Sequence, residues 1–247
     1  MNYRHVFVHA RWMCLELMRQ PTYLVSTIAF PALFYGIFAL PESKDVSSSN
    51  FLMASFSGFA VFGVIFLQFG VGMAQDRSRT WNQYLKTLPV SQWSLFLARF
   101  VTALLFALLA AAAIALMAVT LTHATLSTTA WLKFTLGLLG GGMAFCFMGL
   151  SLGYWASEKS ALPVGNLIYL PLTFAGGLWK PPAILPENLQ SISVYLPTRI
   201  YGEILWATVQ SQRVETKYFL GMIAYAGLFA LISWAGYRRD TDRRLHA

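Results

Sequence analysis

The sequence predicts an all-α integral membrane protein with six transmembrane helices. Only 11% of its 247 residues are charged and 57% are apolar, whereas about a quarter of the residues in a soluble domain are charged. The apolar residues fall into six runs, each near the ~20 residues that a helix needs to cross a bilayer. The predicted spans cover residues 22–40, 51–74, 100–122, 131–155, 161–178 and 217–237. Together with their connections they form one predicted domain over residues 1–247.

Residues 1–20 are predicted to form an amphipathic helix that lies in the membrane interface ahead of the first span. The apolar side chains share one arc of a helical wheel and the basic side chains share the other, a pattern typical of interfacial helices. The apolar arc comprises Tyr3, Val6, Phe7, Ala10, Met13, Cys14, Leu17 and Met18. Pro21 is expected to end this helix, and membrane lipids are its predicted partner.

The distribution of positive charge predicts that both termini are cytosolic. An even number of spans places both termini on one side of the membrane. On that side, the leading segment, the 75–99 connection, the 156–160 turn and the tail carry twelve Lys or Arg and five acidic residues. The other side carries six Lys or Arg and five acidic residues. Because cytoplasmic loops carry an excess of Lys and Arg, the first side is predicted to face the cytosol.

The connection over residues 75–99 is predicted to contain a short amphipathic helix on the cytosolic side. Trp81, Leu85 and Leu88 recur at helical spacing with polar and basic residues between them, which indicates about three helical turns. Pro89 is expected to stop this helix. The periodicity alone fits equally a helix that floats on lipid and a helix that docks on a protein.

The fourth span contains two small-xxx-small steps, from Gly137 to Gly141 and from Gly149 to Gly153, which permit close approach of another helix. The same stretch has the form of the nucleophile elbow of serine hydrolases, Gly-x-Ser-x-Gly, centred on Ser151. That elbow requires a strand-to-helix turn and a histidine base, and no predicted span contains histidine. An intramembrane hydrolase with Ser151 as nucleophile is therefore a minor alternative.

Residues 179–216 are predicted to form a re-entrant helical cap on the outer side. Pro181, Pro182, Pro186 and Pro197 lie in this segment and prevent one continuous helix. Enough apolar side chains are interleaved with the prolines for the segment to enter the outer leaflet. We therefore expect two short helices here.

The sequence lacks both a nucleotide-binding loop and ionisable residues within the predicted spans. No phosphate-binding loop is present, because Glu158 stands before Lys159-Ser160 where that loop requires glycine. The interior of the six spans contains no Asp, Glu, Lys, Arg or His, whereas proton pumps and ion-driven carriers use such groups at membrane depth. The protein must then take its energy from elsewhere or use none. No basic patch with stacking aromatic residues stands apart from the membrane flanks, so nucleic acid is not a predicted partner.

Two segments resemble the permease subunits of type-2 ATP-binding-cassette exporters, of the half-size, six-span kind. The first segment is Asp76-Arg77-Ser78-Arg79 followed by Leu85 and Pro89-Val90-Ser91, which is similar to an acidic, Arg-rich family segment that ends in a Pro-Val-Ser turn. The second covers the fifth span and the cap. Its matching residues are Asn166, Pro171, Phe174, Gly177, Pro181, Leu185, Pro186, Leu189, Ile192, Leu196 and Pro197. With the basic amphipathic start, the resemblance covers nearly the whole chain.

The resemblance implies a dimer with a second copy of the permease, or a close paralogue, in a bacterial cytoplasmic (inner) membrane. Each permease would dock through residues 76–88 onto one of two cytosolic ATP-binding-cassette subunits. Those subunits would bind ATP and Mg, and no cofactor is expected in this chain. The residues implied in the docking are Asp76, Arg77, Arg79, Trp81, Leu85, Leu88 and Pro89.

The function that the resemblance implies is export of an amphipathic or hydrophobic cargo, such as a drug, antibiotic, peptide or lipid-like molecule. Gln68 and Asn166 are polar residues within or near the spans and are candidates to line the cargo path. Satisfying each other or contacting a dimer mate is an equal alternative for these two amides. The alternative function class is a membrane assembly protein that does not transport.

Overall fold

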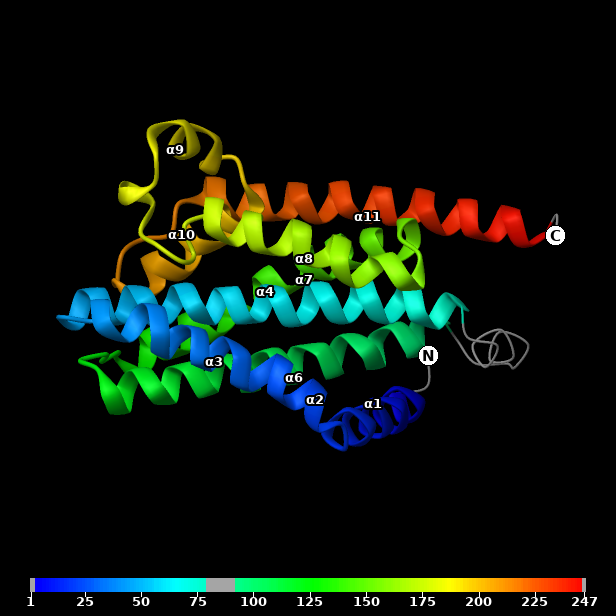
Figure 1. Ribbon diagram of the computed structural model, residues 1–247, viewed down its shortest axis with the longest axis horizontal. Helices are drawn as coiled ribbons and strands as arrows, with labels where there is room; N and C mark the ends of the chain where they lie inside the picture. The colour runs from blue at the N-terminus through cyan, green and yellow to red at the C-terminus, as the bar shows by residue number, and fades with distance from the viewer. Residues whose placement is uncertain (1–2, 79–91, 246–247) are drawn as a thin grey trace.

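Long helices run side by side along one axis of the molecule (Figure 1). The structure, a computed structural model, describes residues 3–78 and 92–245. The longest helices are α4 (Val46–Ser78), α6 (Gln92–Leu121), α7 (Thr128–Trp155) and α11 (Thr216–Leu245). The described residues contain no strand, which confirms the all-α prediction.

Five helical segments of the described residues are long and apolar enough to cross a membrane. They are Pro21–Glu42, Val46–Arg77, Trp93–Leu121, Thr128–Trp155 and Thr216–Thr241. The predicted multi-pass membrane fold is therefore confirmed. Helix α8 (Glu158–Ala175) corresponds to the remaining predicted span and lies along the same axis (Figure 1). It begins earlier than residue 161 because Ser157 and Ser160 form a capping box, which satisfies N–H groups of the first turn.

Helix α4 is the central helix of the bundle. In its most apolar stretch 89% of the residues are buried, compared with 17% in α11. The buried side of α4 is strongly aromatic and packs against α6, α7, α8 and α10. Its fully buried aromatic residues are Phe56, Phe59, Phe62, Phe66 and Phe69. These rings form the core of the protein, so they are not available to cargo in this state.

Glycines of α7 allow two neighbouring helices to approach it closely. A Cβ atom on Gly149 would lie 2.5 Å from the carbonyl oxygen of Phe66, and one on Gly153 would lie 2.9 Å from that of Gly70. A Cβ atom on Gly141 would overlap the ring of Tyr201 in α10 (Pro197–Val209). Both predicted small-xxx-small steps therefore serve helix packing within the chain.

The first span is an irregular helix. It begins with α2 (Pro21–Leu24) and continues through a π-helical turn (Val25–Ala29), α3 (Phe30–Phe34), a second π-helical turn (Tyr35–Ala39) and a 3₁₀ turn (Leu40–Glu42). Pro31 lies inside this helix and has no N–H to donate, so the regular hydrogen-bond pattern is interrupted there. The predicted range of residues 22–40 agrees with this segment, but the sequence pattern did not indicate the wide turns.

Helix α1 (Tyr3–Met18) forms where the amphipathic helix is predicted. Part of its apolar arc packs within the protein, because Val6 and Ala10 form a small buried cluster with Ala98 of α6. Phe7 and Trp12 are exposed. The helix therefore divides its apolar residues between contacts with α6 and the exposed surface, and its position in the membrane interface stays a prediction.

The segment over residues 179–216 contains a 3₁₀ turn (Pro182–Ile184) and two short helices, α9 (Glu187–Ser193) and α10. Helix α10 reaches into the bundle, because the Tyr201 hydroxyl donates a hydrogen bond to the carbonyl of Leu138, 3.3 Å away. Leu138 lies about 15 Å along α7 from its first residue, at a rise of about 1.5 Å per residue. Two short helices were predicted here, and the location of the segment in the outer leaflet stays a prediction.

Helix α4 ends and α6 begins at the same end of the bundle as the C-terminal end of α11, and α1 starts near it (Figure 1). We call this end the Arg77 end and the opposite one the Asn50 end. Within the predicted connection of residues 75–99, α4 continues to Ser78 and α6 starts at Gln92, and residues 79–91 lie outside the described residues. The limit of an apolar run marks the limit of the hydrocarbon layer, whereas a helix can continue beyond it where polar contacts hold it.

Candidate functional site

At the Arg77 end, the side chain of Arg77 joins three helices. Its Nη1 atom donates hydrogen bonds to the carbonyl oxygens of Gly153, at 2.8 Å, and Tyr154, at 2.7 Å, in the last turn of α7. Its Nε and Nη2 atoms donate to Oδ1 of Asp240 in α11, at 3.1 and 2.6 Å. The last carbonyls of a helix have no hydrogen-bond partner inside the helix. A cation at this end is also stabilised by the negative end of the helix dipole. Arg77 thus caps α7 and pairs with α11 at the same time.

The residue before Arg77 makes a second link between helices. Asp76 forms an ion pair with Arg99 of α6, and Nη1 of Arg99 also lies 3.9 Å from the sulfur of Met73. We call Asp76, Arg77, Arg99 and Asp240 the Arg77 cluster. Two consecutive residues of α4 therefore connect it to α6 on one side and to α7 and α11 on the other.

Aromatic residues surround the cluster and hold the ends of α7 and α11 together. The indole N–H of Trp155 donates to the carbonyl of Ile232 at 3.2 Å, and the Arg239 guanidinium lies 5.0 Å from the centre of the Trp155 ring. The rings of Tyr154 and Tyr237 meet edge to face at 5.9 Å. The tail of α11 is therefore part of the packed structure at this end.

The structure places two of the seven predicted docking residues. Asp76 and Arg77 lie together in the Arg77 cluster, where they form ion pairs with Arg99 and Asp240 of the same chain. Arg79, Trp81, Leu85, Leu88 and Pro89, with the predicted amphipathic helix, lie outside the described residues. Their role in docking stays a prediction. Asp240 was not among the predicted site residues, because in the sequence it is one of two acidic residues among the arginines of the tail.

The two residues predicted to line a cargo path lie apart, in different settings. Gln68 of α4 accepts a hydrogen bond through Oε1 from the hydroxyl of Tyr23, at 3.0 Å. The oxygen of its amide therefore already has a partner within the chain. Asn166 lies in α8 and is partly exposed, on a face with the exposed apolar residues Leu162, Leu167 and Leu170. Both side chains are partly exposed, and Asn166 has exposed leucines beside it on α8.

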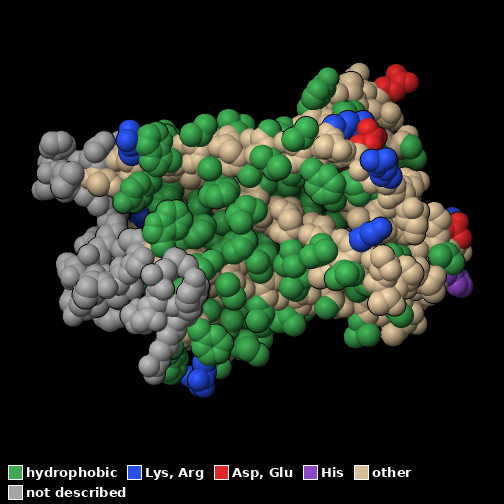
Figure 2. Space-filling view, turned by 180° about the vertical axis from the view of Figure 1, so that it is seen from behind, with side chains coloured by type: hydrophobic (Ala, Val, Ile, Leu, Met, Phe, Trp, Pro, Cys, Tyr) green, Lys and Arg blue, Asp and Glu red, His purple; other side chains and the backbone are tan. Residues whose placement is uncertain are grey.

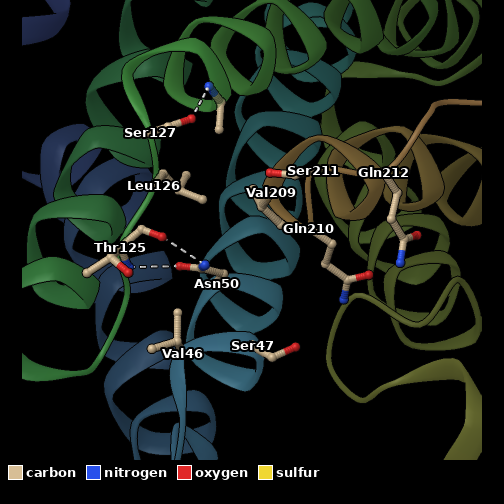
Figure 3. A pocket seen from close by; sticks show the side chains of 11 residues that line it. Val46, Ser47, Asn50, Thr125, Leu126, Ser127, Val209, Gln210, Ser211 and Gln212 are labelled. Atoms are coloured by element: carbon tan, nitrogen blue, oxygen red, sulfur yellow. Dashed lines mark hydrogen bonds between the residues drawn. The ribbon is translucent and has the colours of Figure 1, made fainter.

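A pocket of about 520 Å³ opens at the Asn50 end (Figure 3). The amide of Asn50 bridges to the backbone of Thr125, donating to its carbonyl at 2.9 Å and accepting from its N–H at 3.0 Å. This bridge joins the start of α4 to the connection between α6 and α7. The lining residues are Val46, Ser47, Asn50, Thr125, Leu126, Ser127, Ala130, Val209, Gln210, Ser211 and Gln212. All of them are uncharged, and polar and apolar side chains both line the pocket, so it offers no group that selects an ion by charge.

Ser151 has a structural explanation in helix packing. Its hydroxyl lies 3.0 Å from the hydroxyl of Ser233 and 3.0 Å from the carbonyl oxygens of Phe147 and Phe229. These contacts join α7 to α11 through polar groups, as is common between membrane helices. Ser151 also lies in the interior of a continuous helix and not on a strand-to-helix turn, so the geometry gives the hydrolase alternative no support.

The surface agrees with a protein embedded in a bilayer. Figure 2 shows hydrophobic side chains across the middle of one face and charged side chains toward its two ends. The exposed apolar residues include Leu132 and Leu136 of α7 and Leu220 and Ile223 of α11. A soluble protein rarely exposes so continuous an apolar surface.

Comparison with known proteins decides the family. Residues 5–210 match the ABC-2 type transporter family. The chain belongs to this family. It is also similar to YvfS of Bacillus subtilis (strain 168), a predicted transport permease, with 26% identity over 223 residues. The alignment covers 88% of this chain and 91% of YvfS.

As an ABC-2 permease, the protein is a transmembrane transport subunit of an ATP-binding-cassette transporter. Its partner is an ATP-binding-cassette subunit, and the ATPase activity lies in that partner. The family resemblance of the two sequence segments is therefore confirmed. The family match ends at residue 210, so it includes the Arg77 end of α4 but not Asp240.

Proposed function

We propose that this permease exports an amphipathic or hydrophobic cargo, driven by two cytosolic ATP-binding-cassette subunits that dock on residues 76–88. The observation that carries the proposal is the Arg77 cluster, which joins the start of this segment, in α4, to three other helices of the bundle, α6, α7 and α11. A push on the segment would then reach the whole membrane domain. The uncharged interior of the spans adds support, because it holds no ionisable residues for ion-driven transport.

The proposed orientation places the Arg77 end in the cytosol of a bacterium, at its inner membrane. The excess of Lys and Arg at this end supports it, because positive residues are retained on the cytoplasmic side. A reporter enzyme that is active only in the cytosol, fused after Ala247, should be active. Activity of a periplasmic reporter at the same position would reverse the orientation and remove the docking proposal.

Two copies of the permease are proposed to form the transport unit, with the exposed apolar face of α8 as part of the path or of the contact between copies. Asn166 supports this, because it is partly exposed beside exposed leucines of the same helix, and an amide within the membrane gains stability from a polar partner. A cargo with a polar head and an apolar body would suit the same face. ATP and Mg are proposed to bind only in the partner subunits.

A substitution at the centre of the predicted docking helix tests the proposal. Affinity purification from native membranes should recover a polypeptide with a phosphate-binding loop, identified by mass spectrometry, and Leu85→Asp should abolish this recovery. Leu85→Asp is a sharper change than deletion of residues 76–88, because the deletion also removes Asp76 and Arg77 from the bundle. Ile184→Asp, at an exposed apolar residue toward the Asn50 end, is the matched control. Unchanged recovery with Leu85→Asp would contradict the proposal.

A further inference from the structure

The Arg77 cluster lies where the predicted docking segment begins. Arg77 is in the last turn of α4, which ends at Ser78, and its ion-pair partner Asp240 is 163 residues away in sequence. Helix α11 packs along α7 and α10, and α4 packs along α7. The Arg77–Asp240 pair therefore adds a side-chain link from α4 across the end of α7 to α11.

The link has the geometry of a rigid connection. The side chains of Arg77 and Asp240 are only 23% and 14% exposed, and three nitrogen atoms of the guanidinium are engaged with three separate groups. The guanidinium is planar, so these contacts fix its orientation as well as its position. A lysine has one ammonium group on a flexible stem and cannot hold the carbonyls and the carboxylate in this arrangement.

The neighbouring Asp76–Arg99 pair extends the connection to α6. Movement of the segment that follows Ser78 would therefore act on α6 through Asp76 and on α7 and α11 through Arg77. Coupling of this kind needs a continuous set of packed or hydrogen-bonded groups between the place that is pushed and the helix that moves. The cluster provides such a set over a single turn of α4.

We infer that Arg77 and Asp240 transmit the movement of the docking segment to α7 and α11, which makes Asp240 a positioning residue of the ATP-driven cycle. This inference rests on the proposed docking of residues 76–88. If the Arg77–Asp240 pair only stabilises the fold, its removal should lower stability and leave the ATP-dependent movement of α11 unchanged. Transmission predicts a folded complex in which α11 no longer follows the ATPase cycle.

The test measures the position of α11 in the complex with its ATPase partner. Spin labels at Trp93→Cys and Thr241→Cys, both exposed positions, report the distance between α6 and α11 after Cys14 and Cys146 are replaced by serine. The distance is compared without nucleotide and with ATP trapped by vanadate. Asp240→Asn is expected to reduce the ATP-dependent change to less than half while the ATPase still co-purifies. Arg77→Lys is the second variant, with the same expectation, because it keeps the charge but loses the carbonyl contacts.

The control is Glu203→Gln, which breaks a matched ion pair. The side chains of Arg199 and Glu203 in α10 are 20% and 24% exposed. The Nε and Nη2 atoms of Arg199 both contact Oε1 of Glu203. This variant should keep the full ATP-dependent change in distance. A full change in Asp240→Asn or in Arg77→Lys would overturn the inference, as would no change in the unsubstituted complex. Loss of the ATPase from the unsubstituted complex would instead count against the proposed function.

Discussion

The indole N–H of Trp206 donates a hydrogen bond of 2.7 Å to the hydroxyl of Ser55, joining α10 to the central helix α4 in the buried core. The same indole stacks on Phe51 at 4.9 Å between ring centres. These contacts fix a short helix that enters the bundle from the Asn50 end. The segment over residues 179–216 is therefore anchored on the core and is not a loose covering.

Removal of the acceptor should destabilise this anchor. Ser55→Ala leaves the buried indole N–H without a partner, which should cost about 1–3 kcal/mol of the free energy of unfolding. Denaturation of the purified protein in detergent, followed by tryptophan fluorescence, measures the change. Ser57→Ala is the control, because the Ser57 hydroxyl is buried with no hydrogen-bond partner among the described residues. Equal losses in the two variants would mean that the bond contributes nothing specific.

The contact between α4 and α7 should be intolerant of a methyl group at one glycine. Gly149→Ala places a Cβ atom 2.5 Å from a backbone oxygen of α4, so the helices must separate. We expect a loss of about 1–3 kcal/mol, typical of overpacked cores. Gly140→Ala, in the same helix, has nothing within 4 Å of the new atom and should be neutral or stabilising, since alanine favours helix more than glycine does. A Gly149→Ala protein as stable as Gly140→Ala would contradict this packing.

Asp45 should make the stability of the protein depend on pH at the start of α4. Its carboxylate accepts a hydrogen bond from the backbone N–H of Ser48 at 2.7 Å, and the backbone and hydroxyl of Ser48 lower the pKa of Asp45. The pKa of Asp45 in the folded protein lies below its unfolded value of about 3.9. The ionised carboxylate therefore stabilises the folded protein fully at pH values above this unfolded pKa. This stabilisation is lost as the pH falls through the lowered folded pKa.

The measurement is the melting temperature of the protein and of Asp45→Ala between neutral and strongly acidic pH. The variant should melt lower at neutral pH, and the difference should shrink in acid as the wild-type carboxylate is protonated. Asp45→Asn should retain most of the stability at neutral pH, because asparagine also caps helices well. A difference between wild type and Asp45→Ala that does not change with pH would show that ionisation of Asp45 is irrelevant.

The helices could be predicted from the sequence because hydrocarbon thickness fixes the length of an apolar run. The spans that start near residues 51 and 131 were predicted from the length of their apolar runs alone, and α4 and α7 include both of them. The π-helical turns around Pro31 were not predictable, because their positions depend on packing against other helices. The division of α1 between Ala98 and the surroundings likewise depends on the position of α6.

Only part of the candidate site could be predicted from the sequence. Asp76 and Arg77 stood out because they form a charged motif next to an apolar run. Asp240 could not be connected with them, since nothing local to residues 238–244 indicates a partner 163 residues away. Gly153 and Tyr154 act through backbone carbonyls, which carry no signal in the sequence. Long-range pairs of this kind appear only when the helices are placed in space.

Asn166 should contribute to the association of two permease copies through its amide. It lies eight residues after the start of α8, which is about 12 Å along the helix at 1.5 Å per residue. Hydrogen bonds between membrane helices are worth about 0.6–2 kcal/mol. Asn166→Leu should therefore weaken the dimer about three- to thirtyfold, since about 1.4 kcal/mol corresponds to a factor of ten. Energy transfer between labelled copies in lipid vesicles, measured against protein density, gives the dissociation constant.

The matched control for this change is Leu167→Met, at the adjacent and strongly exposed position of the same helix, which alters shape without removing a polar group. It should leave the dissociation constant unchanged. If Asn166→Leu associates as tightly as Leu167→Met while transport of an amphipathic fluorescent lipid falls, the amide serves the cargo and not the second copy. If neither association nor transport changes, the Asn166 amide has no part in the cycle, and the proposal that the α8 face contacts cargo or a second permease loses its support.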